Sequence, residues 1–113
     1  MDRKTKGKQG EELAQTHYIE LGYEILEKNY RYKRAEVDFI ALFQEELLVF
    51  VEVKARDRRD YGEPETFVSA EQQTRIKEAA EDYIFGIDWH KDIRFDIVCV
   101  DPQNQMEVFQ DAF

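Results

Sequence analysis

The sequence predicts a single α/β (α+β) domain, spanning residues 1–113, in which helices flank a central mixed five-stranded sheet. Two stretches with apolar residues at helical spacing indicate two helices. Runs rich in β-branched and aromatic residues, bounded by turn residues, indicate five strands. Together these stretches give the element order α-β-β-β-α-β-β.

The first helix is expected over residues 8–21. Most of its apolar side chains fall on one face when residues are placed at intervals of about 100°. Gly22 then follows, which is typical of a helix C-terminus. The apolar face consists of Leu13, Ala14, His17, Tyr18 and Leu21.

Three strands should follow the first helix, at residues 23–30, 35–43 and 46–55. Each is rich in residues that favour extended structure. The second and third strands form a hairpin that turns near Gln44 and Glu45.

The second helix should begin after Ser69, because Ser69 and Gln72 have the spacing of a capping box. Strands at 93–100 and 105–113 complete the sheet. The apolar face of this helix consists of Ile76, Ala79, Ala80, Tyr83 and Ile84.

Composition predicts a protein without a membrane-spanning helix. Hydrophobic residues make up 42% of the chain, but no apolar run reaches the roughly 18 residues that a membrane-spanning helix requires. The charged N-terminal segment lacks the apolar core of a signal peptide. Cys99 is the single cysteine, and its apolar neighbours indicate a buried, inert thiol. We therefore expect a cytoplasmic protein.

The net charge of −9 at first disfavours nucleic acid as a partner. The charge is uneven, however. Residues 1–59 hold equal numbers of basic and acidic residues, whereas residues 60–113 carry the whole negative excess. The acidic half would suit a basic protein partner, and the basic clusters form either one phosphate-binding face or a solvated mixed surface. The candidates for nucleic-acid contact are Arg31, Lys33, Arg34, Arg56, Arg58 and Arg59.

Two carboxylates, Asp38 and Glu52, lie in the apolar strands of the predicted hairpin. Opposed residues of an antiparallel pair share a face, and their numbers add up to a constant. Asp38 meets Glu52 only if that sum is 90. A tight turn that closed Leu42 on Leu47 would give 89 and place the two carboxylates on opposite faces. Their convergence therefore predicts an odd-length turn or a bulge between Phe43 and Leu47.

Converging carboxylates at this position would suit a hard cation such as Mg²⁺, which prefers oxygen ligands. The carbonyl of Val53 is a natural third ligand, and Lys54 lies on the same face as Glu52, where it could orient a water molecule. This set of groups is suited to phosphodiester hydrolysis. The alternative is that Glu52 and Lys54 mark the point where a buried strand reaches water, as an ion pair.

Two further polar residues can reach the same region. Glu11 lies at the edge of the apolar face of the first helix, whereas Glu12 faces water. Glu11 could equally be a first-turn acid that complements the helix dipole. Gln72 is either part of the capping box or a side chain directed at the sheet. No Cys/His spacing typical of zinc and no glycine-rich phosphate loop is present.

Several sequence blocks resemble the YraN-like family of small bacterial proteins. These blocks are "GEELA", "LGYEILEKNYR", "AEVDFIAL", "LLVFVEVKAR" and "RFDIVCV", and they extend from about Gly10 to Val100. That family is in turn similar to the PD-(D/E)XK, or restriction-endonuclease-like, nuclease superfamily and to archaeal Holliday-junction resolvases. Two positions depart from the pattern, because Ala35 stands where Gly is usual and Gln72 where Lys is usual.

The resemblance implies a restriction-endonuclease-like fold with a Mg²⁺ site that could also accept Mn²⁺. The metal ligands implied by the resemblance are Glu11, Asp38 and Glu52, in addition to the carbonyl of Val53 suggested by the strand itself. Lys54 would complete the (D/E)xK motif as a catalytic residue, and Gln72 matches a polar position of the following helix.

The implied activity is endonucleolytic cleavage of structured or branched DNA. A homodimer would suit a two-strand cut. The alternative function is a non-catalytic module that binds nucleic acid or protein on the same fold.

Overall fold

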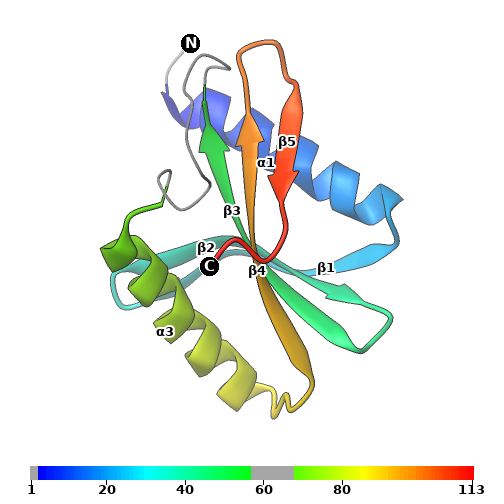
Figure 1. Cartoon of the computed structure of the whole chain (residues 1–113), viewed down its shortest axis with the longest axis vertical. Coiled ribbons are helices and arrows are strands. Elements are labelled where there is room, and N and C mark those ends of the chain that lie inside the picture. Colours follow the sequence, from blue (N-terminus) through cyan, green and yellow to red (C-terminus); the bar gives the residue numbers. More distant parts are fainter. Residues whose placement is uncertain (1–2, 57–67) are drawn as a thin grey trace.

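The computed structural model describes residues 3–56 and 68–113, with side chains from residue 8 onward. Within these residues, five strands form one sheet in the order β1-β2-β3-β4-β5, with helix α1 on one face and helix α3 on the other (Figure 1). Strands β3 and β4 are parallel, and the other neighbouring pairs are antiparallel. The predicted mixed α/β class and element order are confirmed. The elements are α1 (Arg3–Glu20), β1 (Tyr23–Tyr32), β2 (Ala35–Phe43), β3 (Leu47–Ala55), α3 (Ala70–Gly86), β4 (Asp92–Val100) and β5 (Met106–Phe109).

The last strand and the first helix differ from the prediction in extent. Helix α1 begins at Arg3 rather than at Lys8. Strand β5 is shorter than the predicted 105–113, because the chain turns at Gln110 and Asp111 after four paired residues. The end of the chain then folds back, and the N–H of Ala112 donates to the carbonyl of Phe95.

The C-terminal end of helix α1 shows one error in the predicted apolar face. Leu21 is 54% exposed, because the helix ends at Glu20 and the chain turns through Gly22. Gly22 has a φ of 98°, the left-handed conformation expected of a glycine that ends a helix. By contrast, Gln15 is buried, which the apolar pattern did not predict.

The sheet separates two hydrophobic cores. Helix α1 covers one face with Ala14 and Tyr18, and helix α3 covers the other with the predicted stripe that includes Ile76 and Tyr83. Buried sheet residues of the α1 core are Phe39, Ala41, Val49, Val51, Val98 and Val100. Those of the α3 core are Ala35, Val37, Ile40, Leu48, Phe50, Phe95, Ile97 and Cys99.

The register of the β2–β3 hairpin is the one in which Asp38 and Glu52 converge. All paired residues, from Phe43 with Leu47 to Phe39 with Val51, add up to 90. The connection is odd in length, as predicted, and consists of residues 44–46. Its first two residues have positive φ angles of 52° and 60°, as in a type I′ turn, and the N–H of residue 46 donates to the carbonyl of Phe43.

A buried polar network ties helix α1 to strand β4. Asp96 is fully buried, and its carboxylate accepts hydrogen bonds from the Tyr18 hydroxyl (2.6 Å), the Arg94 guanidinium (2.8 Å to each oxygen) and the N–H of Asp111 (3.1 Å). Burial and the neighbouring Asp96 charge raise the pKa of Tyr18. Because several donors bind the Asp96 carboxylate, their hydrogen bonds offset the free-energy cost of burying its charge.

The structure also bears on two predictions from composition, which concern Cys99 and membrane-spanning helices. The Cys99 thiol is buried, as predicted, and burial raises its pKa to about 11, which disfavours the reactive thiolate. Among the described helices, none is long and apolar enough to cross a membrane.

Candidate functional site

The carboxylates of Asp38 and Glu52 lie together at one end of the sheet, in a pocket of about 510 Å³. Strand β2 supplies Asp38 and strand β3 supplies Glu52, and these residues are only 8% and 7% exposed. Helix α1 brings Glu11 to the same pocket, and the first turns of helix α3 bring Gln72. The lining residues are Glu11, Arg34, Ala35, Glu36, Asp38, Glu52, Ser69, Glu71, Gln72, Arg75 and Ile76.

Asp38 occupies the point where strands β2 and β3 separate. Main-chain pairing of the two strands ends at Phe39 and Val51. Beyond that pair, the Asp38 carboxylate takes the place of a main-chain partner, because its Oδ2 accepts the N–H of Val53 at 2.6 Å. The open edge of β3 beside Val53 is therefore occupied by an acid side chain.

Glu52, Lys54 and Gln72 form a triangle of polar contacts. The Lys54 Nζ lies 3.4 Å from Glu52 Oε1 and 3.4 Å from Gln72 Oε1, and the Gln72 Nε2 lies 3.3 Å from Glu52 Oε1. These distances are long for hydrogen bonds, so the groups are adjacent but not tightly held. Glu52 and Lys54 do form the ion pair expected where a buried strand reaches water, and its acid member, Glu52, lines the pocket.

The side chain of Gln72 is directed at the sheet, and only its main chain takes part in the helix cap. Its main-chain N–H donates to the Ser69 hydroxyl at 3.1 Å, as a helix N-cap requires. Its side chain points away from that cap, toward Glu52 and Lys54. The capping pattern and the site therefore use different parts of one residue.

Three pocket acids, Glu11, Asp38 and Glu52, have raised pKa values. Burial and the adjacent Asp38 carboxylate raise the pKa of Glu11 from 4.5 to about 7, and a proton on Glu11 is shared with Asp38 in a hydrogen bond. Burial also raises the pKa of Asp38, although the N–H of Val53 opposes the rise. For Glu52, burial and Asp38 raise the pKa from 4.5 to about 8, against the lowering effect of Lys54.

The pocket carboxylates would interact more favourably with a divalent cation than with one another. Glu52 Oε2 is buried and has no hydrogen-bond partner, which is costly for a carboxylate oxygen. Three acids that crowd together gain from a positive charge placed among them. Among residues 8–56 and 68–113, no group of three His, Cys, Asp or Glu side chains is arranged so that it could hold a metal ion. Mg²⁺ commonly keeps several water ligands and takes only one or two carboxylates.

The predicted nucleic-acid contacts are distributed unevenly around the pocket. Arg34 lines the pocket, while Arg31 pairs with Glu36 at 3.4 Å and Lys33 lies over the ring of Tyr32. Arg56 is half-buried at the end of strand β3, and its N–H donates to the carbonyl of a β4 residue. Arg58 and Arg59 lie outside the described residues.

Sequence comparison assigns the chain to a family. A family model described as "Uncharacterised protein family UPF0102" matches residues 10–100. This chain belongs to the UPF0102 family. It is the family of YraN, so the resemblance of the sequence blocks is confirmed. The matched segment contains every acid of the pocket as well as Lys54 and Gln72.

UPF0102 proteins of distant bacteria are similar along nearly their whole length. The protein of Cytophaga hutchinsonii is 40% identical over 100 residues, which cover 88% of each chain. The protein of Rhodococcus jostii is 40% identical over 113 aligned residues, covering 95% of this chain and 94% of the relative. The protein of Natranaerobius thermophilus is 33% identical, and the alignment covers both chains completely.

Three charged pocket residues of this UPF0102 chain, Glu36, Glu71 and Arg75, are not among the site residues predicted from sequence. Glu36 adds a further acid, and Arg75 adds a basic group that is ion-paired with Glu71 at 2.6 Å. The alternation of strand β2 could have suggested Glu36, which lies two residues before Asp38. Arg75 could have been found because it lies three residues after Gln72 on the same helix.

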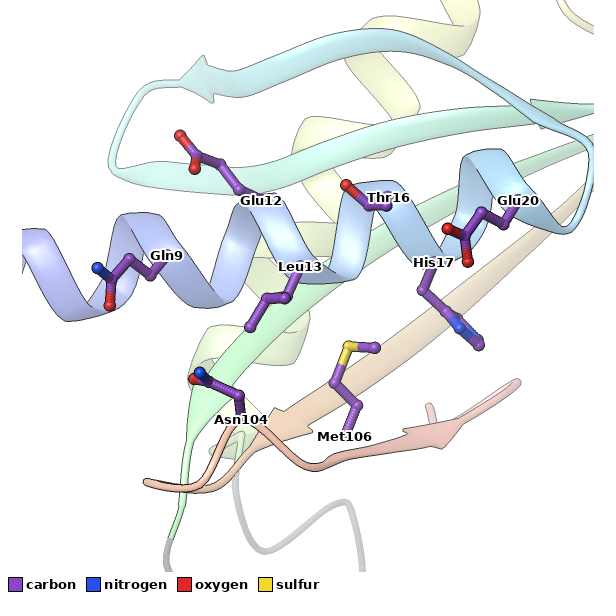
Figure 2. Close-up of a pocket in the computed structure, with 8 residues that line it drawn as sticks. All are labelled: Gln9, Glu12, Leu13, Thr16, His17, Glu20, Asn104 and Met106. Atoms are coloured by element: carbon purple, nitrogen blue, oxygen red, sulfur yellow. The ribbon is translucent and has the colours of Figure 1, made fainter.

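A second cavity, of about 580 Å³, lies between helix α1 and the turn that joins β4 to β5 (Figure 2). His17, expected from sequence to be a core or boundary residue, points toward Met106 in this cavity. The lining residues are Gln9, Glu12, Leu13, Thr16, His17, Glu20, Asn104 and Met106. This set includes no lysine or arginine, so the second cavity lacks the combination of acids and basic groups that lines the first.

Proposed function

We propose that this protein is a Mg²⁺-dependent endonuclease that hydrolyses phosphodiester bonds in structured or branched DNA. One observation carries the proposal. Two nearly buried carboxylates, Asp38 and Glu52, converge beside Lys54, and one carboxylate oxygen of Glu52 has no partner in the protein. A buried, unsatisfied carboxylate oxygen in a polar pocket is a ligand position for a cation.

Asp38, Glu52 and the carbonyl of Val53 would hold the metal ion, with Glu11 bound directly or through water. The N–H of Val53 points at Asp38. Because the N–H and C=O of one strand residue point toward the same neighbouring strand, the Val53 carbonyl is directed at the same open edge. Mg²⁺, when bound, supplies positive charge for a phosphate oxygen and makes a bound water easier to deprotonate.

Lys54 would act on the attacking water and on the charge that develops at the phosphate. Its side chain is 25% exposed and its ammonium group lies beside Glu52 and Gln72, so it can turn toward a ligand in the pocket without entering an apolar environment. Gln72 positions Lys54 and Glu52 relative to each other. Charged donors held at fixed positions are the usual source of transition-state stabilisation in phosphoryl transfer.

Arg34 is the basic residue best placed to hold a DNA phosphate, because it is exposed and lines the pocket. Arg31 and Lys33 are exposed near Arg34 at the β1–β2 turn, and Arg56 follows the end of β3. The pocket acids repel phosphate unless a cation is bound. Substrate binding should therefore depend on the divalent ion as well as on these residues.

A cleavage assay tests the proposal. Labelled duplex, flap, four-way-junction and single-stranded DNA and RNA are incubated with the protein in Mg²⁺, Mn²⁺ or EDTA. Lys54→Ala should lower the cleavage rate by about 100-fold or more, since it removes the positive group beside the proposed metal ligands. Lys77→Ala, which removes a lysine from the exposed side of helix α3, should cleave normally.

The assay also uses Asp38→Asn, with Asp88→Asn as the matched control in an exposed loop. Cleavage that persists in both Lys54→Ala and Asp38→Asn would come from a contaminant and would contradict the proposal. Metal-independent binding without cleavage of any substrate would favour the non-catalytic binding module instead.

A further inference from the structure

Asn29 has a backbone conformation that is unusual inside a strand. It lies within strand β1, yet its φ angle is 52°. Antiparallel strands have φ angles near −140°. Left-handed conformation is rare for residues other than glycine, and asparagine tolerates it better than most. The distortion is therefore one that the residue at this position can adopt.

The side chains of strands β1 and β2 exchange faces at this point. Val37 packs in the α3 core, whereas Phe39, two residues later, packs in the α1 core. In a regular strand, residues two apart share a face. Strand β1 changes faces in the same place, because Tyr30 pairs with Val37 and Lys28 pairs with Phe39. Paired side chains share a face, so both strands turn over together between these two pairs.

Asn29 and Asp38 are the two residues between these pairs, and their own pairing is missing from the ladder. The side chain of a regular strand residue stands perpendicular to the sheet. A perpendicular carboxylate could not accept the N–H of the neighbouring strand, which lies in the plane of the sheet. Asp38 does accept the Val53 N–H, at 2.6 Å, so its carboxylate is directed sideways. The exchange of faces is what allows this direction.

We propose that Asn29 is a positioning residue for Asp38. Its left-handed conformation turns the β1–β2 pair over and so aims the Asp38 carboxylate at the open edge of strand β3. The consequence for metal binding rests on the proposed function, but the geometric role does not.

The test compares substitutions that differ in their tolerance of positive φ. Asn29→Gly keeps the left-handed conformation available, Asn29→Ala disfavours it, and Asn29→Val disfavours it most. The control is Asn104→Val, which places the same strained residue at a φ of 63° in the β4–β5 turn. Two quantities are measured for each protein: hydrogen exchange at the Val53 amide, relative to a core amide such as that of Ile97, and affinity for Mn²⁺.

The Val53 amide should be equally protected in the wild type, Asn29→Gly and Asn104→Val. In Asn29→Val it should exchange at least about ten-fold faster relative to the core amide, because local opening exposes it. In Asn29→Ala the Val53 amide should exchange at a rate between those of the wild type and Asn29→Val. If the valine variant does not fold, the alanine variant is compared with the wild type instead. Mn²⁺ affinity should follow the same order.

Val53 protection that is unchanged in both the alanine and the valine variant would overturn the proposal. An equal loss of Val53 protection in Asn104→Val would also overturn it, since the effect would then be general. If Val53 behaves as expected but the wild type binds no Mn²⁺, the proposed function fails while the positioning role of Asn29 stands.

Discussion

Replacing Glu52 with glutamine should change how the stability of this protein depends on pH. The glutamine keeps the shape of the protonated side chain but cannot ionise. In the folded protein Glu52 has a pKa of about 8, compared with 4.5 in an exposed carboxyl. A raised carboxyl pKa means that folding favours the protonated form. The stability that Glu52 contributes is complete below pH 4.5 and is lost as pH rises toward 8.

The size of the effect follows from that pKa difference. A change of one in pKa corresponds to about 1.4 kcal/mol, so a rise of about 3.5 corresponds to about 5 kcal/mol. Water that enters the pocket when Glu52 ionises would reduce this figure to about 2 kcal/mol. Between pH 5 and pH 9 the wild type should therefore lose about 2 to 5 kcal/mol more stability than Glu52→Gln.

Urea unfolding at a series of pH values in EDTA measures the difference. Trp89 is the only tryptophan and provides the fluorescence signal. Glu12→Gln, which removes an exposed acid from helix α1, is the matched control and should parallel the wild type. A constant stability difference between Glu52→Gln and the wild type from pH 5 to pH 9 would refute the reasoning. Glu52 would then ionise as easily in the folded as in the unfolded chain.

Three further predictions concern the elements that hold the site in place. Ser69→Ala removes the N-cap of helix α3 and should cost about 1 kcal/mol, whereas Ser69→Asp should restore it; equal melting temperatures of wild type and alanine variant would contradict this. Tyr18→Phe removes one donor from the buried Asp96 and should cost about 1–3 kcal/mol in urea unfolding; an unchanged midpoint would show that the bond contributes nothing. Glu45→Gly relieves a φ of 60° in the β2–β3 turn and should raise stability by about 0.5–1 kcal/mol, and a lower melting temperature would argue against strain there.

Much of the fold was predictable because its signals are local. The helix C-terminus at Gly22 and the N-cap at Ser69 each depend on a few neighbouring residues. The hairpin register followed from arithmetic, since convergence of Asp38 and Glu52 required an odd connection, and the structure has one. Leu21 was wrongly predicted to belong to the buried face of the first helix. Periodicity alone does not show at which residue a helix ends.

The remaining features depend on contacts between distant parts of the chain. Tyr18 and Asp96 are 78 residues apart, and no local pattern links them. Arg75 lines the pocket only because the fold brings the start of helix α3 to the acids of strands β2 and β3. The role of Asn29 could not be predicted from sequence either. The alternation of residues within one strand does not show that two paired strands exchange faces at the same point.

Direct measurement of Mn²⁺ binding tests most closely whether the acidic pocket is a metal centre. Calorimetric titration is carried out at pH 7.5 in two buffers of different ionisation enthalpy, with the wild type and with an Asp38→Asn, Glu52→Gln double variant. The wild type should bind Mn²⁺ at one site and release protons, because Glu52 has a pKa of about 8 and must ionise to act as a ligand. The double variant should not bind. Absence of binding by the wild type, or equal binding by the double variant, would contradict the account.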